Sequence, residues 1–133
     1  MTTSGHSRIL MIDDDEGLRE LGRRRLQRND FEVSAAGTLN EARTLMEGTA
    51  FDLLVIDYRL AEEMTGLDFY RELRARGLAI PAILCSGFSD QAREDEARAC
   101  GVSYILPKSP DYLDELPAAV RRVLDPSFKE GSR

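Results

Sequence analysis

The sequence has little cysteine, no apolar run of membrane-spanning length and fewer basic than acidic residues. Cys85 lies inside an apolar run and Cys100 precedes a glycine, which fits neither a disulfide framework nor a metal site. No apolar stretch approaches the roughly 18 residues that cross a membrane, and residues 1–8 lack the apolar core of a signal peptide. We therefore expect a cytoplasmic protein with no attachment to a membrane.

The charge balance argues against a further class of partner. Eighteen Lys and Arg residues against 24 Asp and Glu give a net charge of −6, which disfavours direct nonspecific binding of nucleic acid. The 133 residues suffice for one domain with a real core and are too few for two ordinary ones. We expect a single domain over residues 8–124, with polar tails at 1–7 and 125–133.

Short apolar runs alternate with helical stretches from end to end of the chain. Unbroken apolar runs are typical of strands buried on both faces, and five strand–helix repeats predict a parallel sheet with helices on both sides. Thr38 is the expected N-cap of the second helix, and Gly48, Gly77 and Gly101 stand where helices two to four should end. The predicted strands are 8–12, 31–35, 52–57, 81–85 and 102–106, and the predicted helices are 16–28, 38–47, 66–76, 90–100 and 111–124.

Charged or hydroxyl side chains stand at the end of four of these strands. Asp13 and Asp14 follow the first strand, Asp57 ends the third, Ser86 follows the fourth, and Lys108 follows the fifth. The carboxyl ends of parallel strands meet at one edge of the sheet, where α/β folds place their sites. Clustered carboxylates repel one another unless a cation neutralises them, and oxygen ligands suit Mg²⁺. The pattern predicts a site for a divalent cation and a phosphate.

Some neighbouring residues have a plainer interpretation. We interpret Asp15 as opening the first helix, where the helix dipole favours negative charge. Taken alone, Lys108 would be a solvated loop lysine, and Ser86 would lead into the fourth helix, for which Ser89 is the better N-cap. Asp57 has no such role, because the residues that follow it do not begin a helix.

Four segments resemble the signature segments of the response-regulator receiver domain: ILMIDDDEGLRE, FDLLVIDYRL, PAILCSGFSD and YILPKSP. The resemblance covers about residues 8–124. It implies a flavodoxin-like, doubly wound α/β fold with a five-stranded parallel sheet of order 2-1-3-4-5. The middle segments, DYRL and ILCSGFSD, are similar to those of receivers attached to hybrid sensor kinases.

The resemblance assigns a role to each residue at the strand ends. It implies that Asp57 accepts a phosphoryl group, which Ser86 and Lys108 then contact. It also implies that Mg²⁺ (or Mn²⁺) is held by Asp13, Asp14, Asp57 and the backbone carbonyl of Arg59. Such a site suits phosphoryl transfer, which depends on positioning and charge neutralisation.

The same resemblance implies a signalling domain of a two-component system, with no catalysis beyond its own phosphorylation and dephosphorylation. The phosphoryl donor would be a histidine kinase or a phosphotransfer protein. A downstream protein would bind the face formed by the fourth helix, fifth strand and fifth helix. We expect a monomer or a weak homodimer.

Two residues around Lys108 depart from the family pattern. Ile105 stands where many receivers have an aromatic residue, which puts that half of the usual switch in question, and Tyr104 should point to the opposite face of the sheet. Ser109 replaces the proline that usually follows a cis bond. A cis bond costs about 2.5–4 kcal/mol before serine and about 0.5–1 before proline. We expect either a trans Lys108–Ser109 peptide or a strained cis one.

Two further departures border the predicted site. The loop 61–65 is one residue longer than the usual form, and we expect Glu62 and Glu63 in it to be solvated. Arg59 and Phe88 lie two residues past Asp57 and Ser86, where their side chains can shield or admit water, so we expect altered dephosphorylation.

Two alternatives remain open from the sequence. The motif Asp13-x-Asp15 resembles a phosphohydrolase of the haloacid-dehalogenase type with Asp13 as nucleophile, although Gly17 stands where that motif has Thr or Ser. The chain is also short for that fold with a cap. The other alternative is a docking receiver that never becomes phosphorylated.

Overall fold

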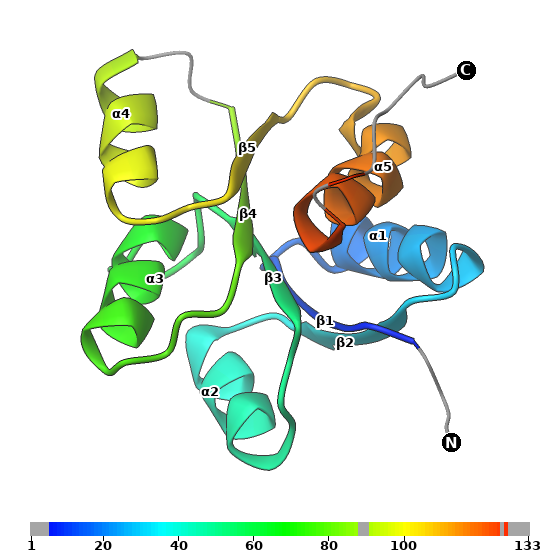
Figure 1. Ribbon diagram of the computed structural model, residues 1–133, viewed down its shortest axis with the longest axis horizontal. Coiled ribbons are helices and arrows are strands. Elements are labelled where there is room, and N and C mark those ends of the chain that lie inside the picture. The colour runs from blue at the N-terminus through cyan, green and yellow to red at the C-terminus, as the bar shows by residue number, and fades with distance from the viewer. Residues whose placement is uncertain (1–5, 88–90, 126, 128–133) are drawn as a thin grey trace.

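The computed structural model describes residues 6–87, 91–125 and 127, which form a five-stranded parallel sheet with a helix after each strand. The strand order is β2-β1-β3-β4-β5, as the sequence predicted (Figure 1). The strands are Arg8–Ile12 (β1), Glu32–Ala36 (β2), Leu53–Asp57 (β3), Ala82–Ser86 (β4) and Tyr104–Pro107 (β5). The helices are Glu16–Arg28 (α1), Leu39–Gly48 (α2), Gly66–Ala75 (α3), Gln91–Ala99 (α4) and Tyr112–Leu124 (α5). Within these residues, no helix combines the length and the apolar character needed to traverse a bilayer.

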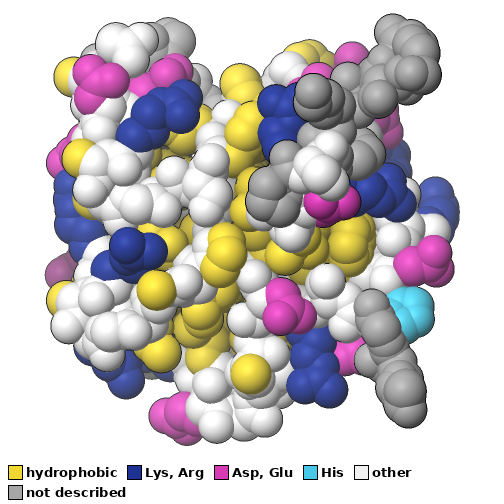
Figure 2. Space-filling model, viewed as in Figure 1, with side chains coloured by type: hydrophobic (Ala, Val, Ile, Leu, Met, Phe, Trp, Pro, Cys, Tyr) yellow, Lys and Arg dark blue, Asp and Glu magenta, His cyan; other side chains and the backbone are white. Residues whose placement is uncertain are grey.

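Helices cover both faces of the sheet and create two hydrophobic cores. Figure 1 shows α1 and α5 on one side of the sheet and α2, α3 and α4 on the other. Successive residues of β1 alternate between the two cores, with Ile9 and Met11 on the α1–α5 side and Leu10 and Ile12 on the other. Hydrophobic side chains are visible between the helices in the space-filling view (Figure 2). This double burial explains why the strands are unbroken apolar runs.

The predicted bounds of strands and helices agree with the structure to within two residues. Thr38 caps α2 as expected, its side chain accepting a hydrogen bond from the Glu41 N–H at 3.1 Å. Gly77 and Gly101 end their helices with φ of +85° and +97°, a region that favours glycine. The prediction for Gly48 is wrong in detail, because this residue is the last of α2 and Thr49 is its C-cap. Ser89, the expected N-cap of α4, lies outside the described residues.

The predicted tails, 1–7 and 125–133, fall largely outside the described residues. The Ser7 carbonyl accepts a hydrogen bond from the Glu32 N–H at 2.9 Å, which continues the ladder between β1 and β2 by one residue. At the other end, the Asp125 carboxylate accepts bonds from the N–H and the hydroxyl of Ser127.

The register of the sheet brings the strand ends together. Ile12 pairs with Ile56, so Asp13 and Asp57 follow at the same level of neighbouring strands. Ser86 pairs with Pro107, so Lys108 follows at the same edge. The carboxyl edge of β1, β3, β4 and β5 therefore gathers residues from four separate parts of the chain.

Candidate functional site

Three carboxylates meet at this edge of the sheet. Oxygen atoms of Asp13, Asp14 and Asp57 all lie within 4.8 Å of one another. Asp13 is 3% exposed and Asp57 is 6% exposed, whereas Asp14 faces solvent. Carboxylates crowded in this way favour a bound cation, and their oxygen atoms suit Mg²⁺. The structure thus brings together the acidic residues that the sequence singled out.

The backbone and α1 hold Asp13 in place. Its N–H donates to the Ala36 carbonyl at 3.1 Å, and its carbonyl accepts from the Arg19 guanidinium at 2.8 Å. Its carboxylate accepts from the Asp15 N–H at 2.9 Å. The Asp15 side chain turns to α1, where it accepts from the Leu18 N–H at 3.1 Å and caps the helix. The helix-opening interpretation of Asp15 is therefore confirmed.

Lys108 supplies the positive charge of the site. Its Nζ lies 3.1 Å from Asp57 Oδ2 and 4.0 Å from Asp13 Oδ2. Its backbone N–H donates to the Ser86 carbonyl at 2.9 Å, which ties the residue to the end of β4. Lys108 is thus an ion-pair partner of the buried acids and not a solvated loop lysine.

The peptide between Lys108 and Ser109 is trans, which decides between the two expected isomers. The Ser109 N–H donates to the Pro107 carbonyl at 2.9 Å and closes a three-residue turn around Lys108. Proline at position 109 has no N–H and would leave this bond unmade. The serine therefore supports a different backbone path that still directs Lys108 to Asp57.

Burial and neighbouring charges set the protonation of the cluster. Burial raises the pKa of Asp13 from 3.8 to about 6, against the lowering effect of the Asp15 N–H bond. Burial also raises the pKa of Asp57, although the hydrogen bond from Lys108 opposes it. Burial lowers the pKa of Lys108, but its hydrogen bond to Asp57 and the nearby negative charges outweigh this and raise it overall. One lysine leaves part of the negative charge uncompensated, which favours an additional cation.

Gly66 allows α3 to approach the end of β3. A Cβ at this position would lie 2.2 Å from the Asp57 carbonyl oxygen and 2.6 Å from Ile56 Cγ2. The Gly66 N–H donates to the Tyr58 carbonyl at 2.9 Å, and a capping box of Thr65 and Asp68 starts the helix there. Only glycine permits this close contact behind Asp57.

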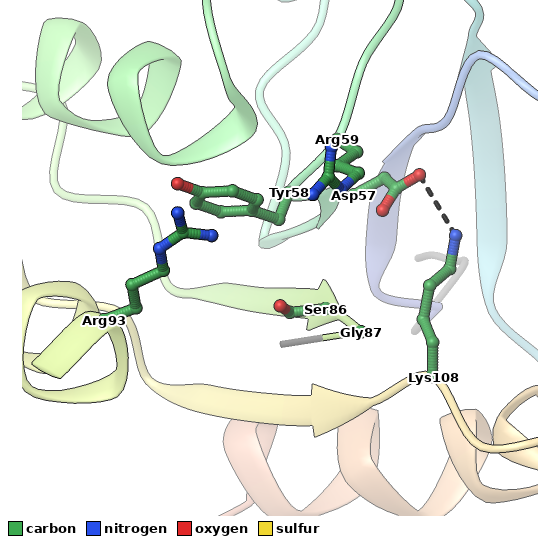
Figure 3. A pocket seen from close by; sticks show the side chains of 7 residues that line it. All are labelled: Asp57, Tyr58, Arg59, Ser86, Gly87, Arg93 and Lys108. Carbon is green, nitrogen blue, oxygen red and sulfur yellow. Dashed lines mark hydrogen bonds and ion pairs between the residues drawn. The ribbon is translucent and has the colours of Figure 1, made fainter. Parts of the chain in front are cut away.

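A pocket of about 250 Å³ opens beside Asp57. In Figure 3, Lys108 reaches Asp57 from one side, and the Ser86 hydroxyl lies between Asp57 and Arg93 of α4. The Arg93 guanidinium stacks on the Tyr58 ring with its carbon 5.7 Å from the ring centre. The residues that line the pocket are Asp57, Tyr58, Arg59, Ser86, Gly87, Arg93 and Lys108.

Sequence reasoning missed the side chains of Tyr58 and Arg93. No local pattern marks them, because Arg93 is one of several charged residues in a polar helix and Tyr58 follows a strand end. Arg59, which was expected to border the site, lines the pocket. Phe88, the other residue expected to influence water access, lies outside the described residues.

Ile105 and Tyr104 of β5 point to opposite faces of the sheet, as predicted. Ile105 is half-buried against the core under α2, α3 and α4. Tyr104 packs against the core under α1 and α5, and its ring lies 5.8 Å from the Arg122 guanidinium carbon. Tyr104 is therefore engaged with α5 within the molecule.

Glu62 is exposed, as expected, but it also makes a contact that the sequence did not indicate. Its Oε2 accepts a hydrogen bond from the Leu39 N–H at 2.9 Å, at the first turn of α2. The longer loop 61–65 is thereby tied to a neighbouring helix, where the free N–H groups favour a carboxylate. Glu63 is exposed, as expected.

Comparison with known proteins identifies the family. The response regulator receiver domain family matches residues 9–121, and the chain belongs to this family. Protein PetR of Rhodobacter capsulatus is 32% identical over 126 residues, covering 92% of this chain and 52% of its own length. The response regulator MprA of Mycolicibacterium vanbaalenii is 32% identical over 117 residues, covering 88% and 50%. The chain therefore spans about half the length of the curated relatives it matches.

Solved structures agree with the family and the fold. The response regulator TrrA of Thermotoga maritima, solved in complex with Mg²⁺-BeF, is 28% identical with a TM-score of 0.75, covering 89% of this chain and 99% of its own. A Francisella receiver domain shares the fold with a TM-score of 0.83 at 23% identity, over 92% of this chain and 100% of its own. Receiver domains of this family are phosphorylated on an aspartate in two-component signalling, bind Mg²⁺ at an acidic pocket, and interact with histidine kinases and downstream effectors.

The family match and the geometry of the site together argue against the phosphohydrolase alternative. Asp15 caps α1 through its side chain and is used within the helix, so the Asp13-x-Asp15 motif lacks its second catalytic acid. A receiver domain, a phosphoacceptor in signalling, accounts for both the family match and the geometry.

Proposed function

We propose that Asp57 accepts a phosphoryl group from a partner histidine kinase or phosphotransfer protein in a Mg²⁺-dependent reaction. The observation that carries this proposal is a nearly buried Asp57 carboxylate, paired with Lys108 at 3.1 Å, at the wall of an open pocket. No other described carboxylate combines this burial, a lysine partner and an open pocket. The domain that carries the function is residues 8–124.

The acidic cluster supports a divalent cation at this site. Mg²⁺ (or Mn²⁺) would be held by Asp13, Asp14, Asp57 and the backbone carbonyl of Arg59, and when bound it neutralises phosphoryl oxygens. The raised pKa of Asp13 and of Asp57 indicates carboxylates that gain from a nearby positive charge.

The transfer itself requires little covalent chemistry from the protein. A carboxylate oxygen of Asp57 forms a bond to phosphorus, and the bond from phosphorus to the donor's histidine nitrogen breaks, with its electrons leaving on nitrogen. Lys108 moves its ion pair from the carboxylate to a phosphoryl oxygen, and the Ser86 hydroxyl bonds another. Water later hydrolyses the acyl phosphate, which is the only other catalysis we assign to the domain.

The signal would leave through the face formed by α4, β5 and α5. Ser86 is 2% exposed at the end of β4, and a hydrogen bond to a new phosphoryl group would draw this end of the strand toward the site. Arg93 of α4 also lines the pocket and stacks on Tyr58, which links that helix to the site directly. We infer a cytoplasmic monomer or weak homodimer that binds a downstream protein and makes no direct contact with nucleic acid.

Intact-mass measurement after incubation with Mg²⁺ and a small phosphodonor tests the proposal. We expect one phosphoryl adduct in the wild type and none in Asp57→Asn. Asp52→Asn is the matched control, because Asp52 lies at the opposite end of β3, where its carboxylate accepts a hydrogen bond from the Arg8 N–H away from the site. No adduct on the wild type would favour a docking receiver, and an undiminished adduct in Asp57→Asn would remove Asp57 from this role. Turnover of a chromogenic phosphate ester would instead favour a phosphohydrolase.

A further inference from the structure

Tyr112, the first residue of α5, lies under the ammonium group of Lys108. The Lys108 Nζ is 5.4 Å from the centre of the Tyr112 ring, within the range of a cation–π contact. Tyr112 is only 6% exposed, so the contact is shielded from water and its strength is not screened as at the surface. Neither the sequence pattern nor the proposed reaction gives this residue a role.

The backbone joins Tyr112 to the turn that carries Lys108. The Tyr112 N–H donates to the Ser109 carbonyl at 3.1 Å, and the Ser109 N–H donates to the Pro107 carbonyl. The turn around Lys108 and the first residue of α5 therefore form one hydrogen-bonded unit. This unit fixes the position of the Tyr112 ring relative to the Lys108 side chain.

Lys108 needs a partner that does not change during the reaction. A lysine side chain has four flexible methylene groups, and among the described residues the Lys108 ammonium group makes one hydrogen bond, to the Asp57 carboxylate that would become phosphorylated. Its distance to Asp13 is 4.0 Å, at the limit of an ion pair. The Tyr112 ring takes no part in the proposed transfer, so it stays available as a partner of the ammonium group before and after phosphorylation.

The ring is held by a well-packed helix. Leu113, Leu116 and Val120 of α5 are buried with Tyr112 in the core under α1 and α5. The Tyr112 hydroxyl is buried and has no hydrogen-bond partner among the described residues. The ring, and not the hydroxyl, is therefore the part of the side chain that contacts Lys108.

We propose that Tyr112 is a positioning residue for Lys108, whose ring holds the ammonium group at the phosphoryl site. The proposal rests on the proposed function for its consequence in the reaction, but the contact itself can be tested without phosphorylation. Removing the ring should misplace Lys108 and slow phosphorylation, whereas removing only the hydroxyl should do neither.

The sequence has only two lysines, Lys108 and Lys129, which makes a direct measurement possible. In protein labelled with ¹³C and ¹⁵N at lysine, the side chain of Lys108 should show a ring-current shift in the NMR spectrum, with the Lys129 signal as internal reference. We expect Tyr112→Phe to keep this shift and Tyr112→Leu to abolish it. Phe31→Leu is the matched control, because the Phe31 ring makes the same kind of contact, at 5.8 Å, to Arg121 of α5, away from the pocket.

The rate of phosphorylation is then measured for the same variants with a small phosphodonor and Mg²⁺. Tyr112→Leu should phosphorylate about tenfold more slowly than the wild type, and Tyr112→Phe and Phe31→Leu should stay within about twofold. If Tyr112→Leu does not fold, Tyr112→Met replaces it. A Lys108 shift that survives in the aliphatic variant, or an equal loss in Tyr112→Phe, would overturn the proposal. Absence of an adduct on the wild type would overturn the proposed function alone, since the NMR arm still reports on the contact.

Discussion

Helices α4 and α5 flank the same strand, β5, but they are attached to the molecule very differently. Within the described residues, α4 buries only Ala97. The buried residues of α5 are Tyr112, Leu113, Leu116, Pro117, Ala119 and Val120. Because burial of apolar side chains is the main source of local stability, α5 is anchored and α4 is held weakly.

The two helices also contribute different parts of the site. The α5 side carries Tyr112 and supports Lys108, which is paired with the buried acids. The α4 side carries Arg93, whose guanidinium is exposed and stacks on Tyr58 (Figure 3). One wall of the pocket is thus firmly anchored, and because the opposite wall has little buried surface, we expect it to shift more easily. This difference suits a receiver, in which binding of the phosphoryl group requires fixed groups and transmission requires an element that moves.

The largest expected effect tests the anchoring of α5. Leu116 is fully buried, so Leu116→Ala should lower the free energy of unfolding by about 2–5 kcal/mol. Ala97→Gly, in the weakly held helix, should cost about 1–2 kcal/mol, from the helix-propensity difference and the loss of one buried methyl group. Urea unfolding followed by circular dichroism measures both. Equal losses in the two variants would mean that the helices do not differ in attachment.

The second prediction concerns Asp13, which lies 4.0 Å from Lys108 and whose pKa is raised to about 6 by burial. The folded protein without metal then binds a proton more tightly than the unfolded chain, so this group's contribution to stability is lost as pH rises from about 4 to above 6. Binding of Mg²⁺ needs the deprotonated carboxylate, so its affinity should fall about tenfold between pH 7 and pH 5. Calorimetry or the rise in melting temperature with Mg²⁺ measures this at each pH.

Asp13→Asn is the control for that experiment. The variant cannot titrate at this position, so the melting temperature of the metal-free protein should lose the part of its pH dependence near pH 6. The gain in melting temperature on adding Mg²⁺ should also be small at every pH. A Mg²⁺ affinity in the wild type that is constant from pH 5 to 7 would show that burial does not raise the pKa of Asp13.

Much of the fold and the acidic part of the site could be predicted from the sequence. Strands buried on both faces must be unbroken apolar runs, and the residue after such a run in a parallel sheet has a defined location. Asp13, Asp57, Ser86 and Lys108 satisfy this rule, because each directly follows or ends a strand. Their grouping depends on topology, which the alternation of strands and helices already limits.

The contacts that surround these site residues could not be predicted in this way. The stacking of Tyr112 under Lys108 and of Arg93 on Tyr58 depends on distances between side chains, for which spacing along the chain gives no rule. The bond from Leu39 to Glu62 likewise joins the first residue of α2 to the loop 61–65, two segments that approach only in the folded protein. The isomer of the peptide before Ser109 was open because the sequence could not show the hydrogen bond that Ser109 makes.

A smaller effect is expected for the side of the pocket that α4 forms with Arg93. Arg93→Ala removes the stack on Tyr58 and should change the free energy of unfolding by no more than about 1 kcal/mol, because the side chain is exposed. In the wild type, phosphorylation should alter amide hydrogen exchange in α4 and leave α5 unchanged, and Arg93→Ala should reduce the change in α4. Arg98→Ala, at an exposed site elsewhere on α4, should not. A change confined to α5 would reverse the assignment of fixed and movable walls.

The smallest expected effect tests whether α5 is held against α1 by its buried apolar side chains or by charge. Arg25 of α1 forms an ion pair with Asp114 of α5, with side chains 34% and 65% exposed. Exposed pairs of this kind contribute about 0.2–1 kcal/mol and are weakened by salt. A double-mutant cycle of Arg25→Ala and Asp114→Ala should therefore give a coupling energy within that range that falls at 1 M salt. A coupling well above about 2 kcal/mol would mean that charge and not the buried face of α5 fixes it to α1. Helix α4 has an ion pair of its own to a neighbouring helix, between Glu96 and Arg71 of α3, so the contrast between the two helices would then lie in the strength of their ion pairs.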